Sequence, residues 1–455
     1  MRRTVRASRA SRSNNLSRKD FLRLGGAGLA GAALLGGGTL AGCGGGGEEG
    51  GGSGDIVFSF GPEDTGTLQK MIDQFNKENE DGITVTYRQM PADTGQYFDQ
   101  VRTEFQSGSA NIDIIGSDVI WPAQFAANGY YLDLSDRFPE DERSAFLEAP
   151  MRSNTWDDKP FGVPWYTDSG MLYYRQDLLE ESGFSEPPQT WEELKEMADR
   201  VKQDSGTKFG FVFQGAEYEG GVCNMLEYVW THGGDALDPN DPNKVIIDSP
   251  ESAAGFATAR SLIEDGVAPE AVSTYKEDES QAAFLNGDAV FMRNWPYIYA
   301  LAADESESKV RQNQIGVAAM PVGATGDGTF STLGGWNFSI NANSQNPDGA
   351  WAFVQYMTDP EQQKMLALET ARIPTRTQLL DDQEILEELP VIRLGKEAIA
   401  RTRPRPVSPY YSDMSLKMAR QFNQTLKGET SPDQAVSTLQ NEMQQIVDQG
   451  QQQSG

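Results

Sequence analysis

Between residues 55 and 115, segments with strand periodicity alternate with segments that have helix periodicity. Residues 55–60 form a short apolar run typical of a buried strand, and residues 68–75 place apolar side chains at the i, i+3, i+4, i+7 spacing of a helix. Residues 83–87 alternate as a strand, residues 98–105 return to helical spacing, and residues 112–115 are again apolar and of strand length. This order predicts a parallel α/β sheet.

Parallel sheets bind ligands in the crevice beyond the carboxyl ends of their strands. In this chain those ends are residues 61–64 and 117–121. We therefore expect a binding site to include one or both of these loops.

A second α/β region follows the first. Thr190 begins a capping box and is predicted to be the N-cap of a helix that runs through Arg200. Residues 209–213, 290–292 and 315–319 have strand character. Pro347 is predicted to open a helix, Ser431 to cap the last one, and residues 449–455 to fray. A chain of 455 residues is long for one core, so we expect two or more lobes.

The charge distribution separates the first residues from the rest. The chain has 38 Lys and Arg against 67 Asp and Glu, a net charge of -29, which argues against a nucleic-acid partner. Residues 1–42 are instead basic and then small and apolar, the layout of an export signal. Leu40–Cys43 resembles a bacterial lipobox, which predicts a signal peptide at 1–42, lipidation of Cys43, and a flexible glycine-rich tether over 43–54.

Two alternatives concern this same region. A short transmembrane anchor is disfavoured because the glycines in the run make it weakly apolar. Residues 17–22 resemble the twin-arginine export motif with lysine in place of the second arginine, so the export route stays open.

The chain has only two cysteines and one histidine, so it has few residues that could act as nucleophiles or bind zinc. If Cys43 is lipidated, only Cys223 remains, so no intramolecular disulfide is expected, and Cys223 is predicted to be a buried apolar residue. The single histidine, His232, lies in a predicted helix end, which disfavours a histidine-dependent nucleophile and a zinc cluster. We expect no cofactor, because the one dinucleotide-like glycine pattern, at 26–31, lies within the signal peptide.

Aromatic and charged side chains gather in segments that have neither helix nor strand periodicity: 165–168, 294–297, 334–336, 403–406 and 410–411. Sugar rings stack their apolar faces on aromatic rings and need charged or amide partners for their hydroxyls. The combination indicates a carbohydrate site, whereas any one tryptophan alone is as well explained by core packing.

The motifs in these segments resemble one family. They are GVPWYTDSGMLYYR (162–175), PPQTW (187–191), QGAEYEG (214–220), RNWPY (293–297), TLGGW (332–336) and PRPVSPYY (404–411). In this order they resemble the extracellular solute-binding proteins of ABC sugar importers, and within them the trehalose/maltose-binding subgroup.

The resemblance implies a periplasmic-binding-protein-like fold with a sugar cleft between two α/β lobes. Lobe I would comprise 55–165 plus about 336–402, and lobe II about 168–333 plus about 405–450, with three crossings near 165–168, 334–336 and 403–406. The implied ligand-binding residues are Asp118, Tyr166, Asp168, Trp295, Gly335, Trp336 and Arg405, with Glu63 or Asp64 from the first loop. Tyr97 stands where the resemblance implies an arginine, which leaves the sugar's identity open.

These features predict a lipid-anchored extracytoplasmic receptor, monomeric and without enzymatic activity. It would capture an α-linked disaccharide by hinge closure and deliver it to an ABC permease in the cell membrane. One alternative is a surface-tethered glycosidase, with Glu217, Glu219, Asp118 and Asp168 as candidate carboxylates. Another is a solute-binding protein for a different, anionic or amino-containing ligand.

Overall fold

The computed structural model describes residues 54–62, 65–91, 94–239, 241–303, 306 and 308–454. Cys43, the predicted signal peptide, the tether up to Ser53, and the candidate residues Glu63 and Asp64 lie outside these ranges. Among the residues that are described, no helix combines the length and apolar character needed to cross a membrane.

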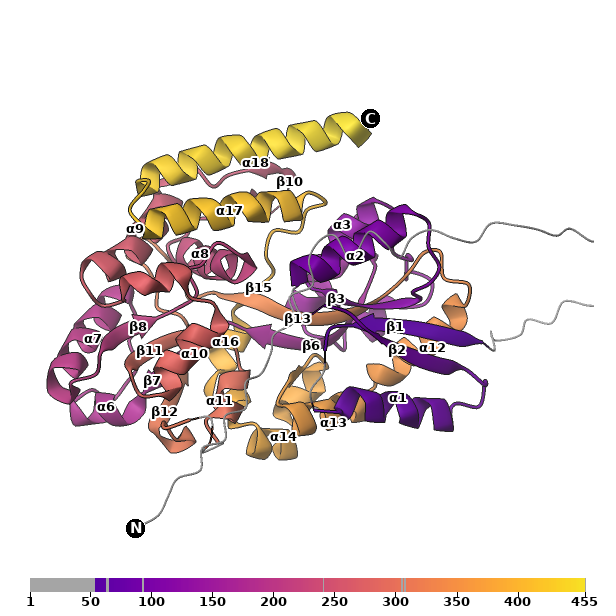
Figure 1. Cartoon of the computed structure of the whole chain (residues 1–455), viewed down its shortest axis with the longest axis horizontal. Coiled ribbons are helices and arrows are strands. Elements are labelled where there is room, and N and C mark those ends of the chain that lie inside the picture. The colour runs from indigo at the N-terminus through magenta and orange to yellow at the C-terminus, as the bar shows by residue number, and fades with distance from the viewer. Residues whose placement is uncertain are drawn as a thin grey trace, which may run out of the picture. The chain divides into compact units, whose positions relative to one another are not determined.

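The first lobe is built on a seven-stranded sheet in the order β14-β6-β13-β3-β1-β2, with β15 paired to β13. The predicted alternation is confirmed as β1 (Asp55–Phe60), α1 (Thr67–Glu78), β2 (Thr84–Gln89), α2 (Thr94–Gln106) and β3 (Ile114–Asp118). Both β2 and β3 pair parallel to β1. Figure 1 shows α1 and α13 (Pro360–Thr370) on one face of this sheet and α2 and α3 (Pro122–Ala127) on the other.

The three strands of the predicted unit are parallel, as expected, but the sheet as a whole is mixed. The strand β13 (Ser331–Ile340) lies antiparallel to β3 and to β6 (Val163–Ser169), and β14 (Ile373–Pro374) is antiparallel to β6. The chain reaches β13 from the second lobe and not through a crossover helix of the first lobe. A crossover helix would make the next strand parallel to the previous one, and this constraint does not apply to β13.

The second lobe has a four-stranded sheet in the order β12-β7-β11-β8. Its strands are β7 (Met171–Arg175), β8 (Phe209–Val212), β11 (Ala289–Asn294) and β12 (Ile315–Ala318), which match the predicted strand segments at 209–213, 290–292 and 315–319. β8 and β11 are parallel, while β7 is antiparallel to both β11 and β12.

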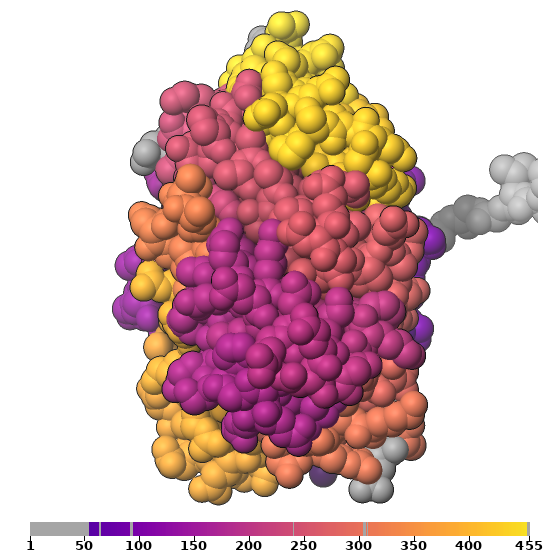
Figure 2. Space-filling view, turned by 90° about the vertical axis from the view of Figure 1, so that its left-hand side faces the viewer, coloured from indigo at the N-terminus to yellow at the C-terminus, as the bar shows by residue number. Residues whose placement is uncertain are grey.

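Helices cover this second sheet and complete its core. α8 (Glu219–Thr231), α9 (Pro250–Glu264), α17 (Tyr411–Leu426) and α18 (Pro432–Ser454) pack together, and α17 and α18 lie side by side in Figure 1. Cys223 is buried within α8, as predicted. Figure 2 shows the yellow C-terminal helices above the magenta segment that follows β7 on this lobe's outer face.

The predicted helix signals are confirmed in detail, with two differences in length. The side chain of Thr190 accepts a hydrogen bond from the backbone of Glu193 at the start of α7 (Trp191–Ser205), which runs five residues past the predicted end. His232 caps the end of α8, followed by Gly233 at φ 90°. The expected fraying from residue 449 is wrong, because α18 continues to Ser454.

The remaining elements are short or connect the two sheets. They are α3 (Pro122–Ala127), α4 (Glu140–Arg143), α5 (Glu148–Ser153), β4 (Thr155–Trp156), β5 (Lys159–Pro160), α6 (Gln176–Glu181), β9 (Leu237–Asp238), β10 (Asp241–Val245), α10 (Glu277–Leu285), α11 (Tyr297–Leu301), α12 (Pro347–Met357), α13 (Pro360–Thr370), α14 (Gln383–Glu388), α15 (Pro390–Leu394), α16 (Lys396–Ala400) and β15 (Thr402–Arg403), with 3-10 turns at Glu270–Thr274, Gln312–Gln314 and Thr377–Asp381.

Three segments pass between the lobes, and they are hydrogen-bonded neighbours. Gly170 alone separates β6 from β7, and its N–H donates to the carbonyl of Thr332 on β13. β13 pairs with β6 on one side and with β15 on the other, and the chain runs from β15 into α17. The segments predicted as crossings lie on β6 (165–168), on β13 (334–336) and from β15 onward (403–406), and their assignment as the crossing points stays a prediction.

The helices α14, α15 and α16 pack in the same hydrophobic cluster as β7, β11 and β12. This cluster also contains Ala367 and Ile373, so it joins the segment 367–398 to the second sheet. The sequence predicts that the whole of 336–402 belongs to lobe I, whereas this packing connects part of that segment to the second sheet. The lobe boundaries stay a prediction.

Candidate functional site

Four predicted site residues project from one face of the first sheet where β3, β13 and β6 lie side by side. Trp336 is paired with Asp118 on one side and with Tyr166 on the other. Asp168 is paired with Gly334, two residues along each strand from that row. Because cross-strand partners and i, i+2 residues share a face, all four side chains belong to one surface.

Trp336 is held by a floor of aromatic rings. Its ring centroid lies 4.9 Å from Phe60, 5.7 Å from Trp121 and 6.0 Å from Tyr97, the last in a stacked orientation. The side chain is half-buried. The rings beneath fix its plane while part of the indole stays accessible, which suits a stacking platform.

Tyr97 belongs to this floor rather than to the exposed surface. Its side chain is 1 % exposed, and its hydroxyl lies 2.8 Å from the Ser59 carbonyl and 3.0 Å from the Gly116 carbonyl. Both partners are backbone atoms of β1 and β3. Direct contact of Tyr97 with a ligand stays a prediction, and the geometry adds a supporting role beneath Trp336.

The backbone conformation at position 335, next to Trp336, requires a glycine. Its φ is 113°, and a Cβ there would lie 2.4 Å from the carbonyl oxygen of Tyr166. A side chain at this position would force β13 away from β6. We infer a structural reason for the glycine that does not depend on any ligand.

Arg405 joins carboxylates that come from both lobes. Its Nη1 donates to Glu219 Oε1 at 2.7 Å, and its Nη2 lies 3.3 Å from Asp118 Oδ1. Asp118 ends β3 in the first lobe, and Glu219 begins α8 in the second. Glu219 also accepts hydrogen bonds from the hydroxyls of Tyr411 and Ser415.

One N–H group of the Arg405 guanidinium has no acceptor among the described residues. Its side chain is 5 % exposed, and its Nε is buried without an acceptor in the described part of the chain. Burial alone would lower the pKa of Arg405, but the Cys223 thiol and the two carboxylates hold that pKa well above its ordinary value. The group stays charged and offers one free N–H.

Burial also raises the pKa values of the two aspartates. For Asp118 burial is the largest cause, opposed by Arg405 and reinforced by Glu219. For Asp168 burial raises the pKa to about 6, opposed by Arg372 and reinforced by Asp118. The carboxylates therefore lie in a partly dry environment that strengthens hydrogen bonds to a polar ligand.

Trp295 reaches the same region from the second lobe. A Cβ placed on Gly334 would lie 3.1 Å from both the indole of Trp295 and the Cβ of Asp168, so these two side chains meet over Gly334. The indole is half-buried, and its Nε1 lies 3.4 Å from Glu277 Oε1. The structure thus brings together all the predicted site residues that it describes, with Tyr97 beneath them.

Sequence reasoning missed two charged residues at this site. Arg372 lies 4.3 Å above the ring of Tyr166 and acts on the charge of Asp168. Glu277 approaches Trp295 from α10. Arg372 precedes the short strand β14, and only its pairing with β6 brings it here, so the local sequence carries no signal for it. Glu217, a candidate of the glycosidase hypothesis, is exposed.

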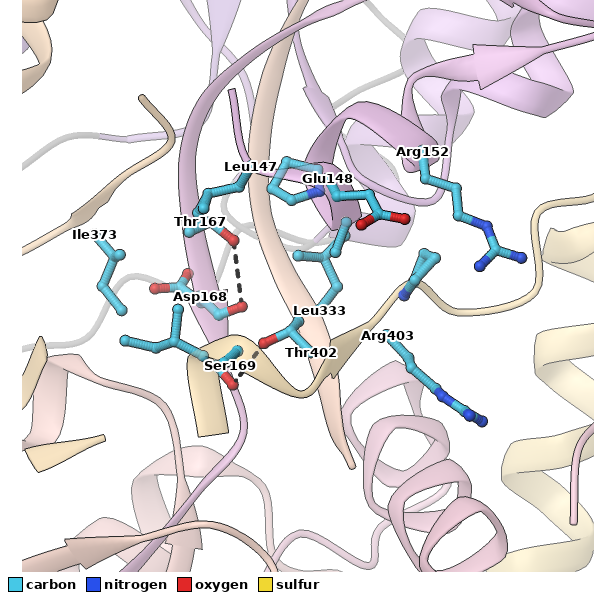
Figure 3. Close-up of a pocket in the computed structure, with 15 residues that line it drawn as sticks. Leu147, Glu148, Arg152, Thr167, Asp168, Ser169, Leu333, Ile373, Thr402 and Arg403 are labelled. Atoms are coloured by element: carbon cyan, nitrogen blue, oxygen red, sulfur yellow. Dashed lines mark hydrogen bonds between the residues drawn. The ribbon is translucent and has the colours of Figure 1, made fainter. Parts of the chain in front are cut away.

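Two cavities flank the segment that leaves β15. One, of about 290 Å³, is lined by residues 167–169, Leu333, Ile373 and Arg403 among others, and Figure 3 shows the Asp168 carboxylate on its Ile373 side, away from Arg152 and Arg403. The other, of about 470 Å³, shares Arg152 and residues 403–404 with it. Neither cavity is lined by Trp295, Trp336 or Asp118, so we define the candidate site by the side chains that converge there and not by a cavity.

Within the described ranges, no group of acidic, histidine and cysteine residues could hold a metal ion.

Comparison with known proteins identifies relatives of this chain. The family model for bacterial extracellular solute-binding proteins matches residues 61–364. A probable ABC transporter-binding protein of Deinococcus radiodurans is 33% identical over 377 residues, which cover 81% of this chain and 88% of that protein. A maltotriose-binding protein of Pyrococcus abyssi is 24% identical over 294 residues, covering 64% of this chain and 60% of that protein.

Solved structures agree with the two-lobed fold. The maltose-bound structure of T. maritima MalE3 superposes with a TM-score of 0.77 at 35% identity and covers 86% of this chain and 99% of that one. A receptor of Streptomyces glaucescens solved with acarbose has a TM-score of 0.74 at 24% identity, covering 87% of this chain and 99% of that one. At 24% identity, the similarity to this second structure supports a shared fold and nothing further.

The raised pKa of Asp168 predicts a pH-dependent gain in stability for Asp168→Asn. Between the ordinary aspartate value near 3.9 and the folded value of about 6, the native state binds a proton more tightly than the unfolded state. Ionisation therefore destabilises the wild-type fold as pH rises through this window. We expect Asp168→Asn to raise the free energy of unfolding by roughly 1 to 3 kcal/mol at pH 7.5 and by little near pH 4.

Urea denaturation at several pH values measures this difference. Glu217→Gln, which changes an exposed carboxylate, is the control and should leave the unfolding free energy nearly unchanged. An effect of Asp168→Asn that is equal at pH 4 and pH 7.5 would contradict the proposed burial of the charge.

Proposed function

The chain belongs to the family of bacterial extracellular solute-binding proteins, and from this premise we propose that it binds an α-linked disaccharide of the maltose or trehalose type for an ABC importer. Its relatives are named as binding proteins of transporters, and the expectation that the chain is not an enzyme is confirmed. Such receptors work outside the cytoplasm and pass their solute to a permease.

The proposal rests on one observation above all: the pairing of Asp118, Trp336 and Tyr166 in a single row across three strands, with Asp168 and Arg405 beside it. This arrangement sets an aromatic face among carboxylates and a guanidinium that retains a free donor. A sugar ring needs those two kinds of partner together. The likeness to the maltose-bound structure supports the α-linked disaccharide as the first ligand to test.

Hinge closure is part of the proposal. The site takes Asp118 from the first lobe and Glu219 and Trp295 from the second, so a ligand that contacts both groups stabilises the approach of the lobes. The two Nη atoms of Arg405 contact Glu219 and Asp118, so this guanidinium lies where carboxylates of the two lobes meet. We further propose that the protein acts as a monomer held to the membrane by lipid on Cys43.

Isothermal titration of the purified chain with maltose, trehalose, maltotriose and sucrose tests the ligand. We expect saturable binding of maltose or trehalose, and small-angle scattering of the saturated protein should show compaction. Binding of only an anionic or amino-containing solute would replace the disaccharide with the alternative ligand class. In a panel extended to monosaccharides and polyols, binding of those alone, or of no sugar at all, would contradict the proposal.

The two tryptophans should dominate affinity. Trp336→Ala or Trp295→Ala removes a stacking surface whose loss costs on the order of 1 to 3 kcal/mol, or roughly ten- to a hundredfold in Kd. Because Trp336 rests on three other rings, Trp336→Phe is added as a variant that keeps the floor filled. Titration with maltose measures the effect, with a thermal melt of each variant.

Trp351→Ala is the matched control for these variants. Trp351 lies on α12 in the core of the first lobe and is only 9% exposed, so its loss should lower the melting temperature and leave Kd unchanged. A folded Trp336→Phe or Trp295→Ala protein with wild-type affinity would remove that residue from the site. Asp168→Asn and Arg405→Lys should instead alter the ranking of sugars, because they change charged hydrogen bonds.

The lipid anchor predicts a specific effect of Cys43→Ser. The wild-type chain, expressed in a bacterium, should incorporate labelled palmitate and sediment with membranes, and Cys43→Ser should do neither. Cys223→Ser, at the buried cysteine, should behave as the wild type. Membrane retention of Cys43→Ser without label would favour the uncleaved transmembrane anchor.

A further inference from the structure

A fully buried ion pair lies between α8 and β11 in the second lobe. Arg293 donates from Nη2 to Glu227 Oε1 at 2.6 Å and from Nε to Glu227 Oε2 at 2.8 Å. The two side chains are 0% and 1% exposed. Removing both charges from water is costly, and replacing such a pair with apolar residues is often neutral or stabilising. Stability alone is therefore a weak explanation for this pair.

The carboxylate of Glu227 also contacts two of the segments that pass between the lobes. Its Oε1 accepts a hydrogen bond of 3.0 Å from the backbone N–H of Thr332 on β13. At Gly170, between β6 and β7, a Cβ would lie 2.0 Å from the same oxygen. Gly170 and Thr332 are themselves joined by a backbone hydrogen bond of 3.2 Å. One carboxylate oxygen thus bonds β13 to α8 and lies directly against Gly170, which is itself bonded to β13.

The guanidinium of Arg293 faces the binding site on its other side. Its central carbon lies 4.1 Å from the ring centroid of Trp295, and its Nη1 donates to Gln214 Oε1 at 3.3 Å. The guanidinium covers one face of the indole, while Glu277 approaches the indole N–H. A cation fixed in this way restrains the tilt of the ring and leaves its opposite face for another partner.

We infer that Arg293 and Glu227 form a positioning pair, which sets the plane of the Trp295 indole and holds the two crossing strands to α8. The inference rests on the proposed function, because it assigns Trp295 to the sugar site. The pair does not touch the ligand in this scheme. It lowers the cost of binding by holding Trp295 in a stacking orientation before the sugar arrives.

The first test separates positioning from stability. Glu227→Gln/Arg293→Met removes both charges at similar volume, so no unpaired charge is left buried. Arg293→Lys keeps the charge opposite Glu227 but loses the planar group over Trp295. We expect both folded variants to bind maltose about tenfold more weakly or worse, with the double variant melting close to the wild type.

The matched control is another bidentate pair in the same lobe. Arg175 donates to both oxygens of Asp177, at 2.8 Å and 2.6 Å, at the end of the β7–β11 ladder opposite to the end that Trp295 follows. Asp177→Asn/Arg175→Met should leave the affinity for maltose unchanged. Wild-type affinity in a folded Glu227→Gln/Arg293→Met protein would overturn the inference.

A second measurement needs no ligand. Acrylamide quenching is recorded for each protein and for the same protein with Trp295→Phe, and the difference reports the accessibility of Trp295. We expect this difference to show more quenching in both Arg293 variants than in the wild type. Unchanged quenching would overturn the inference, and so would failure of both variants to fold, since the pair would then be a folding requirement.

The two measurements also separate this inference from the proposed function. If the wild-type protein does not bind maltose, the proposed ligand is wrong, but the quenching of Trp295 still decides whether Arg293 and Glu227 position the indole. If maltose binds and quenching does not change, the ligand stands and the positioning pair does not.

Discussion

The antiparallel pairing of β6 with β13 is the constraint on which the candidate site depends. The ladder runs from Leu333 opposite Ser169 to Phe338 opposite Val163, with a one-residue register shift between Trp336 and Asn337, and it sets Trp336 beside Tyr166 and Gly334 beside Asp168. The same two strands continue toward the second lobe, where Glu227 contacts both. A slip of one residue would turn these side chains to the opposite face, so register and binding surface are one property of the fold.

Charge is buried at this junction at a cost that the rest of each lobe must offset. Asp118, Asp168, Arg405 and the Arg293–Glu227 pair all lie within or beside the crossing segments. Burial raises the pKa of both aspartates, which is the sign of an ionised form that folding disfavours. The large aromatic and aliphatic clusters on either side supply the compensating burial. Such a distribution is expected where a polar ligand must be met by charged groups in a dry setting.

Local periodicity was sufficient to predict the first three strands and their helices, because each apolar spacing lies within one element. The orientation of β13 could not be predicted, because its partners β3 and β6 are distant in sequence and no crossover helix precedes it. Arg372 was missed for the same reason, since pairing of β14 with β6 alone places it over Tyr166. The motif residues Trp295, Trp336 and Arg405 were found through resemblance, and the sheet register explains why Asp118 and Trp336 belong together.

The hydrogen bonds of Arg405 indicate which contact would break first in the proposed hinge motion. Glu219 is held by Arg405 at 2.7 Å and by two hydroxyls as well, whereas Asp118 meets Arg405 at 3.3 Å. The weaker contact is also the one that reaches the first lobe, since Asp118 ends β3, whereas Glu219 begins α8 and Arg405 lies in the segment that leads into α17. The proposed opening of the site would thus break the Asp118 contact and keep the contacts of Glu219. A ligand hydroxyl that accepts from Nη2 of Arg405 and donates to Asp118 would replace that contact with two hydrogen bonds, which would favour the proposed closed arrangement only when ligand is present.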